Sequence, residues 1–484
     1  MSINLLNKWR LQYVPRLPKI LENPGTIVWQ DSEYRPPLNS EIPRLFPRIS
    51  KFSPVIPQLS NANDHDFLRV GVVLSGGQAP GGHNVISGLH DALKRLNSRN
   101  ILFGFKDGPK GIIESKYTEI SFGLLSQYRN TGGFDLIGSG RTKIETPEQF
   151  QAVEKTVREL KLDGLVIIGG DDSNTNAAFL AEYFLEHGCP TTVVGVPKTI
   201  DGDLKNQEIE ISFGFDTAAK TYSEIVGSIM RDAISAKKYY HFIKLMGRSA
   251  SHITLECALQ TRPNYVLISE EAAAANRTLA EIVNEICDLI TARSEMGKDY
   301  GVILIPEGVI EFIPEFRTLI KELNNNNLSE ESKRCFDSLP KEIQSQLQLD
   351  RDPHGNVQVS KIETERLFIE MVQEELKRRK NEGRYKGKFS AQPHFLGYEG
   401  RSCYPSNFDC QYCYALGFVS ALLVNAKKTG YMSCVSQLNK PSREWEIKGI
   451  PLTSMMKIEQ RNGKNKAVIE KALVDLKGKP FLTL

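Results

Sequence analysis

The sequence predicts an α/β fold with mainly parallel sheets and helices on both faces. Short apolar runs, such as residues 67–77, end in glycines and have the composition of buried parallel strands. Each run is followed by a segment with helical spacing, as in residues 83–96. This unit recurs along the chain, and strands that alternate with helices are typical of parallel sheets covered by helices.

The expected elements follow an irregular N-terminal part. Residues 1–66 are rich in proline and polar residues, so we expect an extended arm wrapped on the core or on a partner. The later strands are expected at 162–170, 191–197, 241–247, 265–269 and 300–306. The helices paired with them are expected at 173–188, 216–236, 249–261 and 278–297.

Two further segments differ from this alternating pattern. Residues 316–387 are charged and contain an amphipathic stretch at 364–380, which indicates an inserted helical element. Residues 406–426 are apolar after a serine and an asparagine, which predicts one more buried helix with an N-cap.

The composition excludes several classes of function. The chain has 484 residues and a formal charge of +3, too small to indicate nucleic-acid or anionic-membrane binding. The apolar run 415–424 is about half the length that spans a bilayer, and the N-terminus has no signal-peptide pattern. We therefore expect a cytoplasmic protein. Its eight cysteines are scattered, and the single C-x-x-C of Cys410 and Cys413 lacks a second ligand pair, so reduced structural thiols are expected.

The first loop of chemical interest is "LSGGQAPGGHN", residues 74–84. It follows a predicted strand and opens a helix, which is good geometry for backbone donors to bind a phosphate. Alone it is equally well explained as a tight strand-to-helix turn. The dinucleotide pattern G-x-G-x-x-G and the P-loop ending are both absent.

The second loop, "GGDDSNT", places two carboxylates at a helix start. One aspartate there is commonly an N-cap, but two in a row cannot both hold that position. Asp171 is therefore a candidate ligand for a divalent cation that bridges phosphates. Asp172 is a negative wall, and a like charge about 4 Å from a phosphate costs about 4 kcal/mol at intermediate dielectric.

The third loop, "VPKTIDGDLKN", carries Lys198, Asp201 and Asp203 after a strand. A lysine and an aspartate three residues apart could stabilise a moving phosphoryl group and accept a proton from its acceptor, although a surface salt-bridge loop remains the alternative. A fourth loop, "LMGRSASH", offers Arg248 as a phosphate clamp.

Together these loops resemble the phosphofructokinase family. The ordered set is S-G-G-x-A-P-G, G-G-D-D-S-N-T, P-K-T-I-D-G-D, M-G-R, P-E-G and Y-E-G-R, and the resemblance extends from about residue 67 to the C-terminus. It is greatest to the long, pyrophosphate-dependent branch. The resemblance implies phosphoryl transfer from pyrophosphate to the C1 hydroxyl of fructose 6-phosphate, with Mg²⁺ as cofactor.

The family pattern also implies roles for individual residues. Asp201 would be the general base, Asp171 would bind Mg²⁺, and Gly77 and Arg141 would contact the diphosphate. The sugar-phosphate residues would be Thr199, Ile200, Asp201, Lys238, Tyr239, Met246, Gly247, Arg248, Glu307, Tyr398, Glu399, Gly400 and Arg401. Among them Arg248 would also stabilise the transition state, and Tyr398 and Arg401 would hold the 6-phosphate end.

The choice of phosphoryl donor follows from two positions. ATP-using relatives usually have glycine where Asp172 and Lys198 stand in this sequence. Asp172 would fill and repel at the site of the nucleotide α-phosphate, and Lys198 would steady the pyrophosphate. Both changes occur together here, which indicates pyrophosphate as donor. The alternatives are an ATP-dependent 6-phosphofructokinase and a non-catalytic regulatory subunit that binds a sugar phosphate.

The resemblance also implies a domain organisation and an assembly. We expect two Rossmann-like three-layer α/β domains, an N-terminal arm and a helical insertion. The expected ranges are 1–66 for the arm, 67–212 completed by about 401–450 for the donor domain, 213–400 for the sugar-phosphate domain with its insertion at about 316–387, and 451–484 for a C-terminal segment. Lys238 and Tyr239 would reach a neighbouring subunit's sugar site, so a homodimer or higher homo-oligomer is expected.

Overall fold

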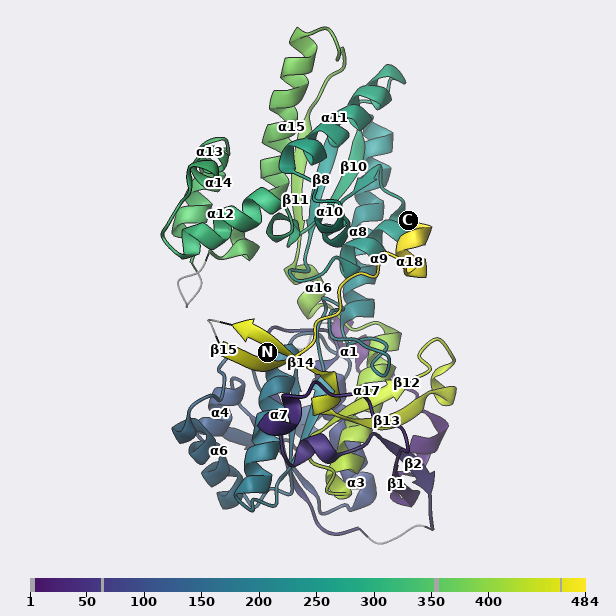
Figure 1. The fold of residues 1–484 in the computed structure, drawn as a ribbon. Coiled ribbons are helices and arrows are strands. Elements are labelled where there is room, and N and C mark those ends of the chain that lie inside the picture. The colour runs from purple at the N-terminus through teal and green to yellow at the C-terminus, as the bar shows by residue number, and fades with distance from the viewer. Residues whose placement is uncertain (1–4, 62–64, 352–356, 462–463) are drawn as a thin grey trace. The chain divides into compact units, whose positions relative to one another are not determined.

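The computed structural model of the chain describes residues 5–61, 65–351, 357–461 and 464–484. The chain divides into two compact units, each of which combines a sheet with helices (Figure 1). Unit 1 comprises Met1–Ala218 and Arg401–Ala472. Unit 2 comprises Ala219–Gly400 and Leu473–Leu484.

Unit 1 is built on a nine-stranded sheet with the order β1-β2-β13-β12-β7-β6-β3-β4-β5. Its strands are β1 (Ile27–Asp31), β2 (Val55–Leu59), β3 (Arg69–Leu74), β4 (Ile101–Phe105), β5 (Tyr117–Glu119), β6 (Gly164–Gly169), β7 (Thr192–Pro197), β12 (Tyr431–Ser436) and β13 (Glu446–Pro451). The five central strands from β12 to β4 are parallel, and the pairs at both edges are antiparallel. The mainly parallel sheet predicted from the sequence is confirmed.

Helices cover this sheet, and a separate hairpin follows it. The helices are α1 (Leu5–Arg10), α2 (Ile42–Leu45), α3 (Gly82–Leu96), α4 (Pro109–Ile113), α5 (Phe122–Leu125), α6 (Pro147–Glu159), α7 (Asp171–Glu186) and α17 (Asn407–Asn425). The 3₁₀ helices are η1 (Lys19–Glu22), η2 (Pro24–Thr26), η3 (Ile49–Lys51), η6 (Ser442–Glu444) and η7 (Leu452–Met455). The hairpin consists of β14 (Met456–Arg461) and β15 (Lys464–Ile469).

The buried helix expected at 406–426 is α17, and it packs on α3 at two glycines. Ser406 is its N-cap and accepts a hydrogen bond from the Asp409 amide at 3.2 Å. A Cβ on Gly88 of α3 would lie 2.1 Å from the Tyr414 carbonyl oxygen. A Cβ on Gly417 of α17 would lie 2.2 Å from the Val85 carbonyl oxygen. The two helices therefore approach at a distance that only glycine permits.

The N-terminal segment contributes strands, which the sequence analysis did not predict. β1 pairs antiparallel with β2, and β2 joins the large sheet through β13, where Val55 is opposite Gly449. Ile27 and Val55 are buried while their neighbours Val28 and Ile56 are exposed. The expected arm thus lies on the core of unit 1, and its strands were not predicted because each is only five residues long.

Unit 2 is built on a four-stranded sheet with the order β11-β8-β10-β9, in which all neighbours are parallel. Its strands are β8 (Tyr240–Leu245), β9 (Tyr265–Val266), β10 (Gly301–Pro306) and β11 (Ala391–Leu396). The helices are α9 (His252–Thr261), α10 (Ser269–Ala274), α11 (Leu279–Glu295), η4 (Val309–Glu311), α12 (Pro314–Asn324), α13 (Glu330–Asp337), α14 (Lys341–Leu349), η5 (Val359–Lys361), α15 (Thr364–Asn381), α16 (Tyr398–Ser402) and α18 (Lys479–Thr483). The long helix α8 (Phe215–Ala236) begins in unit 1.

The charged segment expected as an insertion is packed into the core of unit 2. Figure 1 shows α12, α13 and α14 together, with α15 alongside the sheet. Phe316, Phe368 and Val372 belong to the same buried cluster as Tyr240 and Ile303 of the sheet. A buried ion pair also joins α15 to β8, since the Lys244 ammonium lies 3.2 Å from Glu365 with side chains 3% and 6% exposed.

Removal of one partner of this ion pair is expected to destabilise unit 2 strongly. The Lys244 ammonium also donates to the Ile362 carbonyl at 3.0 Å and lies 4.4 Å from the centre of the Phe395 ring. Removal of one charge leaves the other buried without its partner, which costs about 3–5 kcal/mol. Glu365→Gln should therefore lower the free energy of unfolding by that amount in a urea titration followed by circular dichroism.

Two comparisons make this test specific. The double variant Lys244→Met/Glu365→Leu should lose less stability than Glu365→Gln, because neither charge remains buried. Lys361 and Asp350 form an exposed ion pair at 3.2 Å, and Asp350→Asn should cost less than about 1 kcal/mol. Equal losses for Glu365→Gln and Asp350→Asn would contradict the expectation.

Within the described residues, no helix is both long and apolar enough to cross a membrane. All eight cysteines are free thiols, and Cys410 and Cys413 are buried in α17. Burial raises the pKa of the Cys410 thiol to about 12, so this thiol is protonated at neutral pH.

Candidate functional site

The loops predicted to carry chemistry in unit 1 meet where the strand order reverses. The chain leaves β3 for β4 on one side, whereas β6 lies on the other side of β3. Ligands of open parallel sheets bind at the carboxyl ends of the strands at such a point. The Ser173 hydroxyl donates to the Ser75 hydroxyl at 2.7 Å, and the Gly76 amide donates to the Gly140 carbonyl at 2.9 Å. The first bond joins the end of β3 to α7, which follows β6, and the second joins it to the loop that contains Gly140.

Lys198 lies at the first glycine loop. Its side chain is buried, and its ammonium donates to the Gly77 carbonyl at 2.8 Å. Burial lowers the pKa of Lys198 to about 8; the charge of Asp201 opposes this shift, and Arg401 and Arg141 add to it. A lysine in this state carries a charge with little hydration, which is suited to binding a phosphate.

Two arginines surround the same glycine. A Cβ on Gly77 would lie 3.5 Å from both Arg141 Nη2 and Arg401 Cζ, so both guanidinium groups lie against this loop. Three cationic groups therefore converge on Gly77. The resemblance assigns Arg401 to the 6-phosphate end of the sugar, and the structure places it beside the expected diphosphate residues of unit 1.

The two consecutive aspartates lie in the first turn of α7. Gly170 is the N-cap of this helix, so neither carboxylate holds that position. Negative charge is favoured there by the helix dipole. Asp172 is half-exposed and forms an ion pair with Lys143 at 3.3 Å. The Asn174 amide group donates to the carbonyls of Gly169 and Gly170 at 2.6 and 3.0 Å, which holds the start of the helix against β6.

The third loop follows β7 and is anchored at its start. The Lys198 amide donates to the Gly169 carbonyl at 3.0 Å, and the Asp201 amide donates to the Thr199 hydroxyl oxygen at 3.1 Å. Ile200 is buried and Asp203 is almost fully buried. The backbone that carries the expected base, Asp201, is therefore held in place by local hydrogen bonds.

A cation that the sequence analysis did not identify lies among these carboxylates. The Lys471 ammonium is 3.6 Å from Asp171 Oδ2 and 3.7 Å from Asp203 Oδ2. Burial opposes its charge, but Asp171, Asp203, Asp201 and Asp172 raise the pKa of Lys471 above its ordinary value. The acidic cluster of Asp171 and Asp203 thus has a fixed positive partner in the structure.

The residues present fit a divalent cation of the magnesium type. No group of three or more acidic, histidine or cysteine side chains in the described part of the chain is arranged to hold a metal ion. Magnesium does not need such a group, because it is usually held by one or two carboxylates together with substrate phosphates and water. The Asp171 carboxylate, in the first turn of α7 beside the expected phosphate loops, supplies one such ligand.

In unit 2 the M-G-R and P-E-G loops lie side by side, because they follow the neighbouring strands β8 and β10. Met246 is buried, and the Gly247 amide donates to Glu307 Oε2 at 3.1 Å. Gly247 has φ +131°, which favours glycine. The Arg248 guanidinium is more than half exposed and donates to Glu311 at 3.2 Å.

The Y-E-G-R loop follows β11, on the other side of β8. Tyr398 is 72% exposed, and the Glu399 carboxylate accepts a hydrogen bond from the Gly397 amide at 2.8 Å. A Cβ on Gly400 would lie 2.4 Å from the Tyr222 hydroxyl oxygen, so this position must be small. Lys238 and Tyr239 lie just before β8, and Tyr239 has a left-handed φ of +66°.

The structure thus groups the predicted residues within each unit. Unit 1 brings together Gly77, Arg141, Lys198 and Arg401, with Asp171, Asp172, Thr199, Ile200 and Asp201 on the adjacent loops. Unit 2 brings together Met246, Gly247, Arg248 and Glu307. The sequence analysis did not identify Lys143 and Lys471 as site residues. A single lysine on a turn or after a hairpin has no local sequence pattern that distinguishes it from a solvent-exposed surface lysine.

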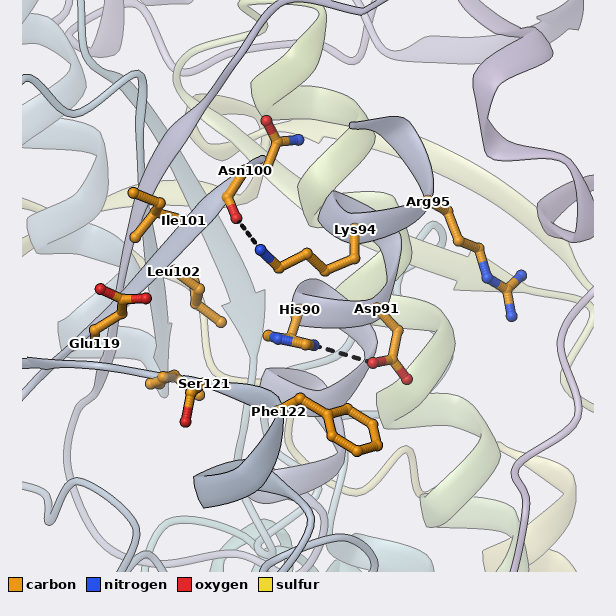
Figure 2. Close-up of a pocket in the computed structure, with 11 residues that line it drawn as sticks. His90, Asp91, Lys94, Arg95, Asn100, Ile101, Leu102, Glu119, Ser121 and Phe122 are labelled. Carbon is orange, nitrogen blue, oxygen red and sulfur yellow. Dashed lines mark hydrogen bonds and ion pairs between the residues drawn. The ribbon is translucent and has the colours of Figure 1, made fainter. Parts of the chain in front are cut away.

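A separate hollow in unit 1 lies away from these loops. It has a volume of about 540 Å³ between α3 and the β4–α5 region. Figure 2 shows His90 and Asp91 paired at 3.1 Å and Lys94 bonded to the Asn100 carbonyl at 2.5 Å within it. The lining contains no predicted site residue.

Comparison with known proteins adds three findings. The family model described as Phosphofructokinase matches residues 69–424. A Treponema pallidum (strain Nichols) protein named pyrophosphate–fructose 6-phosphate 1-phosphotransferase is 51% identical over 99% of this chain and 90% of its own. The Arabidopsis thaliana protein named as subunit beta 1 of that transferase is 52% identical over 96% of this chain and 85% of its own.

Solved structures support the fold. A pyrophosphate-dependent phosphofructokinase from Nitrosospira multiformis superposes with a TM-score of 0.59, and the match covers 80% of this chain and 83% of that one. At 16% sequence identity this likeness speaks for the fold alone.

Proposed function

The chain belongs to the phosphofructokinase family, and from this premise we propose that it transfers a phosphoryl group reversibly from pyrophosphate to the C1 hydroxyl of fructose 6-phosphate. The products are fructose 1,6-bisphosphate and phosphate. The observation that carries the proposal is the identity of about half of all residues, over nearly the full length, to proteins named for this reaction.

The arrangement of unit 1 supports pyrophosphate as the donor. Lys198 is buried and bonded to the Gly77 loop, where Arg141 and Arg401 add two further charges. A chain of two phosphates carries several negative charges and needs this concentration of cations, because charge develops on the transferring oxygens. Asp172 follows Asp171 in the first turn of α7, and its carboxylate forms an ion pair with Lys143.

Each group in unit 1 then has a distinct task. Asp201 accepts the proton from the C1 hydroxyl as the oxygen attacks the phosphoryl group. Lys198 stabilises the charge on the pyrophosphate oxygens. Asp171 would hold Mg²⁺, which neutralises phosphate charge when bound.

We assign the binding of the sugar phosphate to residues of the P-K-T-I-D-G-D, M-G-R, P-E-G and Y-E-G-R motifs. Met246, Gly247 and Arg248 form one loop, and Glu307 accepts the Gly247 amide hydrogen bond that fixes its shape. Arg248 is exposed enough to reach a phosphate, and its bond to Glu311 can be exchanged for one. Thr199 and Ile200 extend the sugar contacts, Tyr398 and Arg401 serve the 6-phosphate end, and Glu399 and Gly400 lie between them in the sequence.

The assembly is proposed to be a homodimer or larger homo-oligomer. Lys238 and Tyr239 lie in the turn between α8 and β8, where the family pattern places residues that reach a neighbouring subunit. The left-handed backbone at Tyr239 presents this turn in a defined conformation. A cytoplasmic location is proposed on the sequence features given above.

A parallel assay with pyrophosphate and ATP tests the proposal. Wild-type protein should form fructose 1,6-bisphosphate with pyrophosphate and not with ATP. Turnover with ATP alone would support an ATP-dependent 6-phosphofructokinase instead. Absence of turnover with either donor would support a non-catalytic regulatory subunit.

Asp172 is expected to control the choice of donor. A like charge about 4 Å from a phosphate costs about 4 kcal/mol, which corresponds to about a thousandfold in affinity. Asp172→Gly should therefore give measurable turnover with ATP and lower turnover with pyrophosphate, measured as kcat/KM for each donor. Asp172→Asn is the matched control, because it removes the charge and keeps the volume.

The two variants separate repulsion from steric exclusion. If charge dominates, Asp172→Asn should gain ATP turnover almost as well as Asp172→Gly. If volume dominates, only the glycine variant should gain it. No gain of ATP turnover in either variant would contradict the role of Asp172 in donor choice.

A further inference from the structure

Lys471 lies at the donor site but belongs to none of the motifs that define it. It follows β15, near the C-terminus, and its ammonium is within 3.7 Å of both Asp171 and Asp203. These two aspartates come from different loops, after β6 and β7. A single lysine from the C-terminal segment therefore connects the two acidic loops of the donor site.

The backbone around Lys471 is fixed on both sides. The Ile469 amide donates to the Thr175 hydroxyl oxygen of α7 at 3.1 Å, and the Glu470 amide donates to the Met455 carbonyl at 2.9 Å. On the other side, the Ala472 amide donates to the Asp203 carbonyl at 2.7 Å. These bonds attach the chain to α7 and to the Asp203 loop, so the position of the ammonium is set by the fold.

The charges explain why such a residue is needed. Asp171 is the expected ligand of the divalent cation, and it shares the Lys471 ammonium with Asp203, which is almost fully buried. Two carboxylates that share one ammonium would repel one another if that positive charge were removed. The Lys471 ammonium supplies a positive charge at this point before any ligand arrives.

We propose that Lys471 is a positioning residue of the donor site, which holds Asp171 and Asp203 in place in the metal-free enzyme and competes with the divalent cation for the Asp171 carboxylate. The inference rests on the proposed function only in assigning Asp171 to the metal. When the cation binds, the ion pair between Lys471 and Asp171 breaks. The ion pair between Lys471 and Asp203 stays, so the geometry of the Asp203 loop is preserved. The free enzyme consequently binds the metal weakly, and the metal enters most readily together with pyrophosphate.

The test is a titration of the full-length protein with Mn²⁺, without pyrophosphate or sugar phosphate, in which free Mn²⁺ is measured by electron paramagnetic resonance. Lys471→Met should bind Mn²⁺ about five- to tenfold more tightly than wild type, because the competing ion pair is gone. Lys471→Gln should show the same increase in Mn²⁺ affinity, and it replaces Lys471→Met in the test if the methionine variant is unstable. Asp171→Asn should lose this binding in both backgrounds.

Two controls define the result. Lys471→Arg keeps the charge and should bind Mn²⁺ as wild type does. Lys466→Met removes an exposed lysine of β15, in the same hairpin, and should have no effect. A second readout is thermal unfolding in EDTA, where Lys471→Met should unfold at a lower temperature than wild type and should recover when Mn²⁺ is added.

Unchanged or weaker Mn²⁺ binding by both Lys471→Met and Lys471→Gln would overturn the proposal. The titration contains no substrate, so its outcome is independent of whether wild-type protein turns over pyrophosphate. Turnover by the wild type with unchanged metal affinity in the variants would leave the proposed function standing and remove the role of Lys471.

Discussion

Asp201→Ser should lower kcat by about 10²–10⁴-fold, while fructose 6-phosphate should still bind. This is the expected result if Asp201 accepts the proton of the C1 hydroxyl, because serine at this position cannot act as a base at neutral pH. The loop should keep its conformation, because two hydrogen bonds that do not involve the Asp201 side chain hold it. The amide of residue 201 donates to the Thr199 hydroxyl oxygen, and the Lys198 amide donates to the Gly169 carbonyl. Steady-state kinetics give kcat, and calorimetry gives the affinity for the sugar phosphate.

Two further variants test whether the loss of activity is specific to the Asp201 carboxylate. Asp201→Asn keeps the volume of the side chain and should lose activity to the same extent as Asp201→Ser. Glu208 lies in the same connection and pairs with Lys448 at 3.2 Å, so Glu208→Gln should retain wild-type kcat. If Asp201→Asn keeps more than a tenth of wild-type kcat, Asp201 is not the base.

Lys198→Met is expected to lower kcat/KM for pyrophosphate by about 10²–10³-fold. The ammonium is buried and bonded to the Gly77 carbonyl, so it acts on the donor in a site with little water. Removal of one such preorganised charge-stabilising group typically has an effect of this size. Affinity for fructose 6-phosphate should change little. A neighbouring exposed lysine gives the control, since Lys205→Met removes a charge from the same loop and should leave kcat/KM unchanged.

The lowered pKa of Lys198 predicts a pH dependence with a definite sign. With a pKa of about 8, Lys198 is charged below pH 8 and loses its proton as pH rises through that value. Only the charged form stabilises the phosphate, so kcat/KM for pyrophosphate should fall above pH 8. Because kcat/KM reports the free enzyme, bound pyrophosphate should move the decline of kcat itself to higher pH. Lys198→Arg stays charged and should not show this decline; an identical decline in that variant would assign it to another group.

The strand-end loops of both units were accessible from sequence because their signals are local. A buried parallel strand is a short apolar run, and a ligand loop after it needs glycines and polar residues. The runs before Gly77, Asp171 and Lys198 therefore identified three loops that the sheet order then places together. The helix expected at 406–426 was also correct, because its apolar length and N-cap serine lie in one segment.

Contacts between distant segments were not accessible in this way. Asp172 has a partner in Lys143, and Asp171 and Asp203 share Lys471, which lies several hundred residues along the chain from Asp171. Arg401 lies against Gly77, a contact between segments far apart in the sequence that its motif does not indicate. The strands of the N-terminal segment were missed for the same reason, since β2 is paired to β13, from the far end of the sequence.

The sequence by itself determined the class of fold, the family and the chemical identity of the loops, because apolar periodicity and the order of short motifs are properties of neighbouring residues. Only the tertiary structure decided which charges neutralise one another at the donor site. Ion pairs depend on distances of a few ångströms between side chains, and those distances are set by how strands are ordered in the sheet and where the C-terminal segment is attached. Lys471 lies beside Asp171 and Asp203 only because the C-terminal segment is attached there.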